Sequence, residues 1–428
     1  MNAKNVIAAQ IQQVKPALEV KPGLWEMFRR CFMNTIETTV QQTTGDTFVI
    51  TGDIPAMWLR DSTAQVLHYL RFADQKEVAE MIEGLISRQA DCILRDPYAN
   101  AYNRKPSDFK PYNDSPRPSD WVWERKYEID SLCYPLWLAD KYWRRTGNTG
   151  FLTEKFHEMI RKVVEVFRVE QDHDRSEYRF QRTDCPPSDT LSRDGRGAEV
   201  KPTGMTWSGF RPSDDACMYG YLIPSNLFAI RVMKAAKDFA GMFGDEGLAN
   251  AAAELSVQIA EGVEKYAMVD HPVFGRIYAY EVDGLGNANL MDDANVPSLL
   301  SLPYLEVCGA EDPVYRNTRA FVLSRENPYY YQGKYAQGIG SPHTPAGYIW
   351  PIALCVQAMT SGDVREIAGI VGTLMNTHAG TGFMHESFDP NAPEKFTRDW
   401  FAWANSMFGE LIYRLYEDGR LVEVLSLV

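Results

Sequence analysis

The sequence predicts an all-α fold, an (α/α)6 toroid with short β-hairpins on its rim. Amphipathic helical patterns recur along all 428 residues, and each pair of them follows a long loop rich in Gly, Pro and aromatic residues. These units form roughly six modules of about 60 to 85 residues, without detectable repetition of sequence. An irregular helical solenoid whose loops do not converge is the alternative. No linker divides the chain, so residues 1–428 are expected to form a single domain.

The first module carries the segment TGDIPAMWLRDST, residues 51–63. Gly52 and Pro55 interrupt regular structure, and the run from Asp61 to Thr63 has the residue types that cap a helix. A helix is expected to follow, through Val66, Leu67, Leu70 and Phe72. Arg60 beside Asp61 offers fixed donors and acceptors to a polar ligand, or else forms an ordinary ion pair.

The other modules repeat this order of loop and helical hairpin. In each, apolar residues three to four positions apart predict the helices. Short strands are expected at 47–51 and 276–283. Helices are expected at 24–40, 76–95, 132–142, 151–171, 225–239, 247–267, 297–306 and 311–325, and from Tyr348, from Asp363 and through Met407, Leu411 and Leu415. In a toroid, the loops meet at the N-termini of the inner helices and build one pocket there.

Composition excludes several classes of function. Hydrophobic residues make up 45 % of the chain, with 22 Tyr, 20 Phe and 10 Trp, which is enough for a large core and argues against disorder. The 57 acidic and 44 basic residues give a net charge of -13. Such a chain repels nucleic acid and anionic membranes, so neither is expected as a partner. A neutral polar ligand fits better.

The cysteines predict a reducing compartment. All seven are scattered, and none lies in a CxxC or a Cys/His cluster. The first 20 residues show no signal-peptide pattern, and no apolar run reaches transmembrane length. We therefore expect a cytoplasmic protein.

The loops contain many carboxylates but no recognisable metal or nucleotide motif, so no metal or cofactor is expected. Metal-free acid and base chemistry remains. Most of the candidate groups are expected to be helix caps or hydrogen-bonding partners. The candidates are Asp61, Glu124, Glu128, Asp130, Asp214, Asp215, Asp283, Asp292, Asp293 and Glu386.

Two of these carboxylates stand out. In the run Ser213 to Asp215, which follows Trp207 and Phe210, an apolar setting would raise the pKa of one carboxyl and keep it protonated as a general acid. The same run could instead cap a helix. Glu386 lies in a Gly-rich aromatic loop where no helix requires a carboxylate, although a loop ion pair would also explain it.

Three classes of function fit these residues. Two carboxylates facing each other across an aromatic cleft are the equipment of glycoside hydrolysis. A sugar epimerase or isomerase would use two histidines from among His343, His378 and His385. A non-catalytic glycan-binding protein would need the aromatic residues but no opposed carboxylates.

Long segments of the sequence resemble glycoside hydrolase family 125. They include GDIPAMWLRDSTAQ, WERKYEIDSLCYP, TGMTWSGFRPSDDA, YEVDGLGN, MDDANVPSLL, GSPHT, MHESF and FAWAN, and the similarity runs from about Leu24 to the last helix. The resemblance implies an (α/α)6 catalytic domain and a metal-independent, inverting exo-α-1,6-mannosidase. Its substrate would be a mannose-containing oligosaccharide, an N-glycan or mannan fragment.

The resemblance also implies roles for particular residues. Asp214, the first Asp of the SDD run, matches the general acid, and Glu386 of MHESF matches the general base. Arg60 and Asp61 match positions that hold the sugar. The further substrate-binding residues expected on this basis are Glu124, Arg211, Asp283 and His343.

Overall fold

The protein is mostly helical, and its computed structural model describes residues 2–428. Short 3₁₀ segments extend or link several helices. The α-helices are α1 (Ala3–Gln10), α2 (Lys15–Leu18), α3 (Leu24–Thr38), α4 (Leu59–Ala64), α5 (Lys76–Arg95), α6 (Ile129–Thr146), α7 (Glu154–Val169), α8 (Ser192–Gly195), α9 (Ile223–Met242), α10 (Glu246–Tyr266), α11 (Pro313–Val322), α12 (Pro351–Met359), α13 (Val364–Asn376), α14 (Ala402–Glu417) and α15 (Leu421–Leu427).

The strands are short and form separate antiparallel sheets of two or three strands. They lie in the loops between helices. The strands are β1 (Val40–Thr43), β2 (Asp46–Val49), β3 (Met57–Trp58), β4 (Ala101–Tyr102), β5 (Asp114–Ser115), β6 (Val122–Glu124), β7 (Gln181–Arg182), β8 (Tyr221–Leu222), β9 (Met268–His271), β10 (Gly275–Tyr278), β11 (Glu281–Val282), β12 (Ala288–Asn289), β13 (Tyr330–Gln332), β14 (Gln337–Ile339), β15 (Ser387–Asp389) and β16 (Ala392–Thr397).

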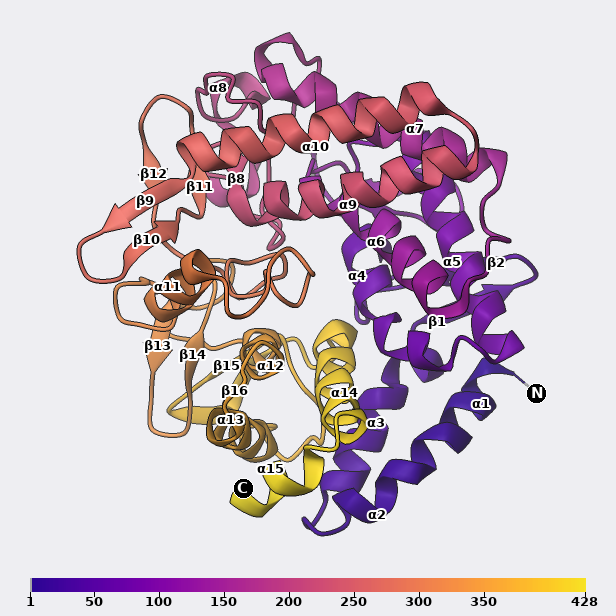
Figure 1. The fold of residues 1–428 in the computed structure, drawn as a ribbon, viewed down its shortest axis with the longest axis vertical. Helices are drawn as coiled ribbons and strands as arrows, with labels where there is room; N and C mark the ends of the chain where they lie inside the picture. Colours follow the sequence, from indigo (N-terminus) through magenta and orange to yellow (C-terminus); the bar gives the residue numbers. More distant parts are fainter. Residues whose placement is uncertain (1) are drawn as a thin grey trace.

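The helices follow one another around a ring (Figure 1). Helix α6 contacts α4 and α9, and α14 contacts α3, α4 and α12. Helices α5, α7 and α10 lie on the outside of the ring. Helix α5 packs on α7, and α10 packs on α9. The predicted helical hairpins are therefore present, and the expected hairpin strands lie in the loops between them.

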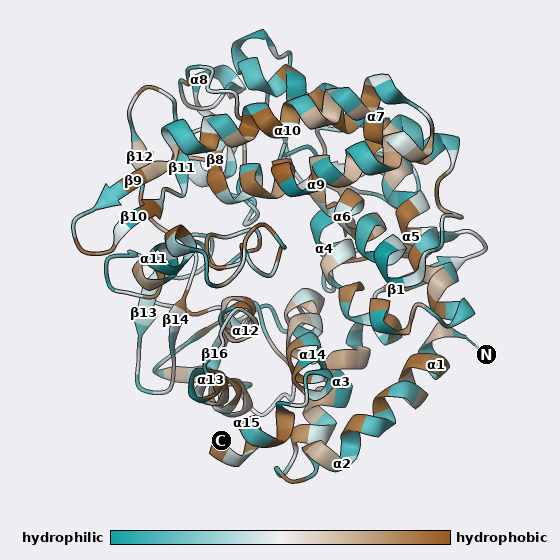
Figure 2. Cartoon of the chain, in the orientation of Figure 1, coloured by the Kyte–Doolittle hydropathy of each residue, from teal (hydrophilic) through white to brown (hydrophobic). Residues whose placement is uncertain are grey.

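Amphipathic sequence explains the outer helices. Figure 2 shows hydrophilic and hydrophobic colours alternating along α7 and α10. In α7, Phe156, Ile160, Val163 and Phe167 recur at helical spacing and are buried. The Thr153 side chain caps this helix by accepting a hydrogen bond from the Phe156 amide. One continuous hydrophobic cluster runs through the molecule from α1 to α15.

One predicted helix is absent. Residues 298–308 form turns instead of the helix expected at 297–306. The Asp292 carboxylate accepts hydrogen bonds from the Leu299 and Leu300 amides, at 2.8 and 2.9 Å, which fixes a turn. Proline at 303 has no backbone N–H to continue a helical ladder. The apolar residues of this segment are nevertheless buried, so their pattern indicated burial and not helix.

The structure also corrects the first module. Helix α4 begins at Leu59, so Asp61, Ser62 and Thr63 lie inside it and do not cap it. Ser62 and Thr63 accept hydrogen bonds from the Gln89 amide of α5, at 2.9 and 2.8 Å. The predicted continuous helix breaks after Ala64 and resumes as a 3₁₀ segment, Leu67–Phe72. The polar run thus anchors α4 to α5.

All seven cysteines are unpaired, as predicted, and five of them are buried. Within residues 2–428 no helix has the length and apolar character needed to cross a membrane.

Gly220 lies in the loop before α9, where it packs tightly against Trp207. A Cβ atom at this position would lie 2.2 Å from two atoms of the Trp207 indole, which is buried and stacks on His173. We expect Gly220→Ala to lower the free energy of unfolding by about 1 to 3 kcal/mol, the usual cost of overpacking. Urea denaturation measures it. Gly369→Ala is the control, because Gly369 is exposed in α13 with no atom within 4 Å of the added methyl group. A loss in the control equal to that in Gly220→Ala would contradict this packing argument.

Candidate active site

The start of α4 carries one wall of a pocket. Trp58 is the residue before the helix, and Arg60 and Asp61 lie in its first turn. All three side chains are nearly buried. The strand pair β3 and β4 fixes this entry, because Trp58 pairs with Ala101 across it.

A tight loop before α9 carries Asp214. Its backbone has φ of 68°, in the left-handed region that Asp and Asn adopt more readily than most residues. Two backbone hydrogen bonds close the loop, from the Asp214 amide to the Arg211 carbonyl and from the Arg211 amide to the Asp215 carbonyl. The Lys126 ammonium donates to the Asp214 carbonyl at 2.7 Å. The loop therefore directs the Asp214 carboxylate by a constrained backbone. It does not cap a helix, because α9 begins only at Ile223.

The opposite wall comes from the C-terminal third of the chain. Glu386 immediately precedes β15, and its carboxylate lies 3.5 Å from the Arg398 guanidinium. Arg398 also pairs with Asp53. The residues directly before α12 and α14, Trp350 and Phe401, are buried beside this pair. Helices α12 and α14 thus direct their N-terminal ends toward the same pocket.

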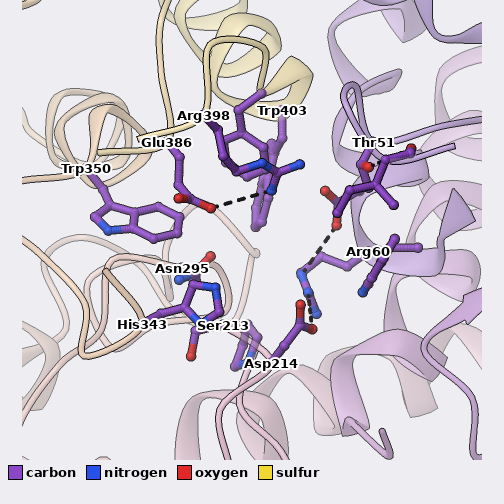
Figure 3. A pocket seen from close by; sticks show the side chains of 15 residues that line it. Thr51, Arg60, Ser213, Asp214, Asn295, His343, Trp350, Glu386, Arg398 and Trp403 are labelled. Atoms are coloured by element: carbon purple, nitrogen blue, oxygen red, sulfur yellow. Dashed lines mark hydrogen bonds and ion pairs between the residues drawn. The ribbon is translucent and has the colours of Figure 1, made fainter. Parts of the chain in front are cut away.

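These walls line a pocket with a cavity volume of about 50 Å³, and the empty space rises to about 380 Å³ when its mouth, open to solvent, is included. Figure 3 shows Asp214 and Glu386 on opposite sides of it, with Arg60 beside Asp214. Asn295, just ahead of the turn segment that replaces the predicted helix, also lines the pocket. The lining residues are Thr51, Ile54, Trp58, Arg60, Asp61, Pro212, Ser213, Asp214, Asn295, His343, Trp350, Glu386, Arg398, Phe401 and Trp403.

Arg60 is the centre of a buried ion cluster. One of its terminal nitrogens donates to Glu128 at 2.5 Å and to Asp130 at 3.1 Å. The other terminal nitrogen donates to Asp214 at 3.2 Å, and its Nε lies 3.7 Å from Asp61. Burial disfavours the charged guanidinium, but the carboxylates outweigh it and raise the pKa of Arg60.

Burial also shifts the carboxylates of the cluster. It raises the pKa of Asp61 and of Asp130 to about 6, although Arg60 opposes both shifts. It raises the pKa of Glu128 further, with the Arg60 charge again opposing. Several acidic groups thus compete for one guanidinium, and their titrations are linked.

Asp214 behaves differently from the sequence prediction. Its burial does raise the pKa, but the charge of Arg60, a hydrogen bond with Glu128 and the charge of Lys126 outweigh burial and lower it. The expected apolar environment was therefore the wrong description. Cations that are distant in sequence surround this carboxylate.

Three predicted substrate-binding residues lie outside the pocket lining. Glu124 accepts from Asn100 at 3.0 Å and from Arg182 at 2.8 Å. Arg211 makes a two-point ion pair with Glu281, at 2.7 and 3.0 Å. The Asp283 carboxylate accepts the amides of residues 285 and 287 and so shapes a turn. Each of them supports a loop near the pocket.

The histidines do not form a pair in the pocket. His343 lines it, and its Nδ1 lies 3.3 Å from Asp215. His378 lines a separate pocket beside Arg30. The His385 ring stacks on Phe396 at 3.7 Å between ring centroids. The two-histidine chemistry of an isomerase is therefore not assembled here.

Sequence reasoning did not single out several lining residues. Arg398 and Trp403 lie in the segment RDWFAWANS, and Asn295 lies in MDDANVPS, both of which follow loops. The signal available for Arg398 was an Arg beside acidic and aromatic residues shortly before α14. No such signal marks Asn295, because no helix follows it directly. No cluster of three or more His, Cys, Asp or Glu side chains within residues 2–428 is arranged to hold a metal ion.

Comparison with known proteins identifies the family. A family described as metal-independent alpha-mannosidase (GH125) matches residues 21–413. The chain belongs to the GH125 family. It is therefore a glycoside hydrolase of the alpha-mannosidase type, which confirms the resemblance seen in the sequence.

Two relatives extend over most of the chain. A solved metal-independent alpha mannosidase from Streptococcus pneumoniae is 44 % identical, covers 100 % of this chain and 99 % of its own, and superposes with a TM-score of 0.93. The meiotically up-regulated gene 157 protein of Schizosaccharomyces pombe is 40 % identical over 95 % of this chain and 85 % of its own length. A bacterial glucoamylase, 11 % identical with a TM-score of 0.59, covers 94 % of this chain and 56 % of its own. It shares the fold alone.

His343 gives this GH125 protein a pH-dependent contact. Burial lowers the pKa of His343, but the hydrogen bond with Asp215 and the charges of Asp215, Glu386 and Asp214 raise it to about 9. Because the folded pKa is raised, the contact stabilises the fold fully below the ordinary value of about 6.5. This stabilisation is lost as pH rises toward 9. The imidazole is 37 % exposed, so solvent screens the effect.

We expect the melting temperature of the wild type to exceed that of His343→Gln at pH 6, and the difference to shrink between pH 6.5 and about 9. Thermal unfolding without ligand measures it. Asp215→Asn should remove the same pH dependence, because it removes the partner of His343. A difference that grows with pH would contradict the ion pair.

Proposed function

We propose that this GH125 protein is an inverting exo-α-1,6-mannosidase that releases terminal mannose from N-glycan or mannan fragments. The observation that carries the proposal is the pocket in which Asp214 and Glu386 lie on opposite sides. Two carboxyl groups across a sugar-sized space can protonate the leaving oxygen and activate a water. The similar Streptococcus pneumoniae enzyme was solved in a non-productive complex with alpha-1,6-mannobiose, which supports the linkage.

In the proposed mechanism Asp214 is the general acid. Its proton passes to the glycosidic oxygen while the bond from the anomeric carbon to that oxygen breaks. Glu386 is the general base, and it removes a proton from the water that attacks the opposite face of the sugar. Arg398, at 3.5 Å, orients the Glu386 carboxylate toward the pocket.

The remaining lining residues suit a terminal mannose. The aromatic faces of Trp350, Phe401 and Trp403 provide the apolar surface that stacks on a sugar ring. The indole N–H groups of Trp58 and Trp403 lack a hydrogen-bond partner among the described residues, so sugar hydroxyls could accept from them. Asp61 accepts from hydroxyls in its ionised form. A pocket of this kind favours removal of one terminal sugar over cleavage within a chain.

The proposal extends to the architecture and the compartment. We infer one (α/α)6 catalytic domain over residues 1–428, which the ring of helices and the continuous core support. The seven unpaired cysteines support a reducing, cytoplasmic location. Non-catalytic glycan binding is the weaker alternative, because binding alone does not require opposed carboxylates.

Proton NMR of α-1,6-mannobiose hydrolysis tests the reaction. We expect release of mannose that appears first as the β-anomer, because direct attack of water inverts the α-linkage. A chelator should not change the rate. First appearance of α-mannose would contradict inversion, and binding without turnover would favour the glycan-binding alternative.

Asp214→Asn tests the general acid. The amide keeps the shape and tolerates the left-handed backbone, but it delivers no proton, so we expect a loss of kcat of about a hundred- to ten-thousand-fold. Isothermal titration should show that mannobiose still binds. Asp215→Asn is the matched control, since its carboxylate contacts His343 and Ser213. A dead Asp215→Asn with an active Asp214→Asn would move the assignment by one residue.

A further inference from the structure

The Arg60 cluster holds more carboxylates than cations. Glu128, Asp130 and Asp214 each contact the same guanidinium, and Asp61 lies 3.7 Å from it. The neighbouring cation, Lys126, pairs with Asp189 and Glu124 instead. Like charges at such distances raise one another's pKa, which favours a proton within the cluster.

Glu128 is placed to share that proton with Asp214. One Asn100 amide nitrogen donates to Glu128 Oε1 at 3.2 Å and to Asp214 Oδ1 at 3.3 Å. The two terminal nitrogens of Arg60 bridge the same two carboxyl groups. The two carboxyl groups are therefore neighbours that accept from the same two side chains. A proton on either group would let it donate a hydrogen bond to the other.

The two groups differ in their access to substrate. The Glu128 side chain is fully buried and does not line the pocket, whereas the Asp214 side chain is 25 % exposed and does. Burial favours the neutral form of Glu128. A proton held by this pair is therefore expected on Glu128 before substrate binds, because the charges of Arg60 and Lys126 favour the ionised form of Asp214, which cannot act as an acid.

We propose that Glu128 is a positioning residue that stores the catalytic proton and passes it to Asp214 when substrate binds. This inference rests on the proposed function. The glycosidic oxygen and the sugar replace water around Asp214, which favours its neutral form. The proton moves from the Glu128 carboxyl to the Asp214 carboxylate, and Arg60 stabilises the Glu128 carboxylate that remains.

The proton then completes a balanced cycle. Asp214 protonates the departing oxygen, the bond to the anomeric carbon breaks, and a water adds while Glu386 takes its proton. One water is consumed, Glu386 ends protonated, and the Glu128–Asp214 pair has lost one proton. Solvent returns that proton to the pair and accepts the one on Glu386, which restores the starting state.

Glu128→Gln, assayed on two substrates, tests the proposal. Gln keeps the size of the side chain but stores no transferable proton. On α-1,6-mannobiose, whose leaving group needs protonation, we expect kcat to fall by about a hundred- to ten-thousand-fold. On α-mannosyl fluoride, whose leaving group departs without a proton donor, we expect no comparable loss. The alkaline limb of the kcat/KM profile should also move to lower pH.

Asp130→Asn is the matched control. Asp130 contacts the same Arg60 nitrogen as Glu128 but does not share the Asn100 amide nitrogen that donates to both Glu128 and Asp214. Any loss in this variant should be equal for the two substrates. An equal loss in Glu128→Gln would overturn the proposal, because it would reveal a purely structural role. A substrate-dependent loss in Asp130→Asn would overturn the assignment to Glu128.

A second measurement serves if Glu128→Gln fails to fold. Infrared difference spectra of the wild type at pH 7 should show the stretch of a buried protonated carboxyl group, and Asp214→Asn should remove or shift it. Absence of that band would overturn the proposal. A wild type inactive on both substrates would instead refute the proposed function, so the two failures are distinguishable.

Discussion

Burial of the Arg60 guanidinium is the constraint on which the site depends. A cation that is only 3 % exposed is stable only with well-placed anions, and it finds them on α6, in the loop before α9 and on its own helix. Removing one partner of such a pair typically costs about 3 to 5 kcal/mol. The contact between α4 and α6 and the position of the Asp214 loop therefore depend on the same buried charge.

The helical hairpins could be predicted from the sequence because their apolar residues repeat at helical spacing. The pattern failed at 297–306, where the buried side chains are held in turns by Asp292. It also failed at the start of α4, whose polar run binds α5 and caps nothing. In both places a tertiary hydrogen bond overrode a local preference, and no single-sequence pattern reports such a bond.

The site was partly predictable for a related reason. The predicted residues that reached the pocket lie in loops or in the first turn of α4, and the residues directly before α4, α12 and α14 line the same pocket. Glu124, Arg211 and Asp283 carry the same chemical groups but are bound by nearby partners that the sequence does not indicate. The ionisation of Asp214 was misjudged because its cations come from other modules. The predicted residues that do line the pocket are Arg60, Asp61, Asp214, His343 and Glu386.

The left-handed backbone at Asp214 limits which residues can replace it. A glutamate there would keep the carboxyl group, yet it adopts that conformation less readily than Asp or Asn and would carry the carboxyl group one methylene further into the pocket. Glutamate is therefore chemically similar to Asp214, but it is not expected to be tolerated at this position. Among the acidic residues only Asp satisfies both the backbone and the reach, so a search for altered activity should vary its neighbours and keep this side chain.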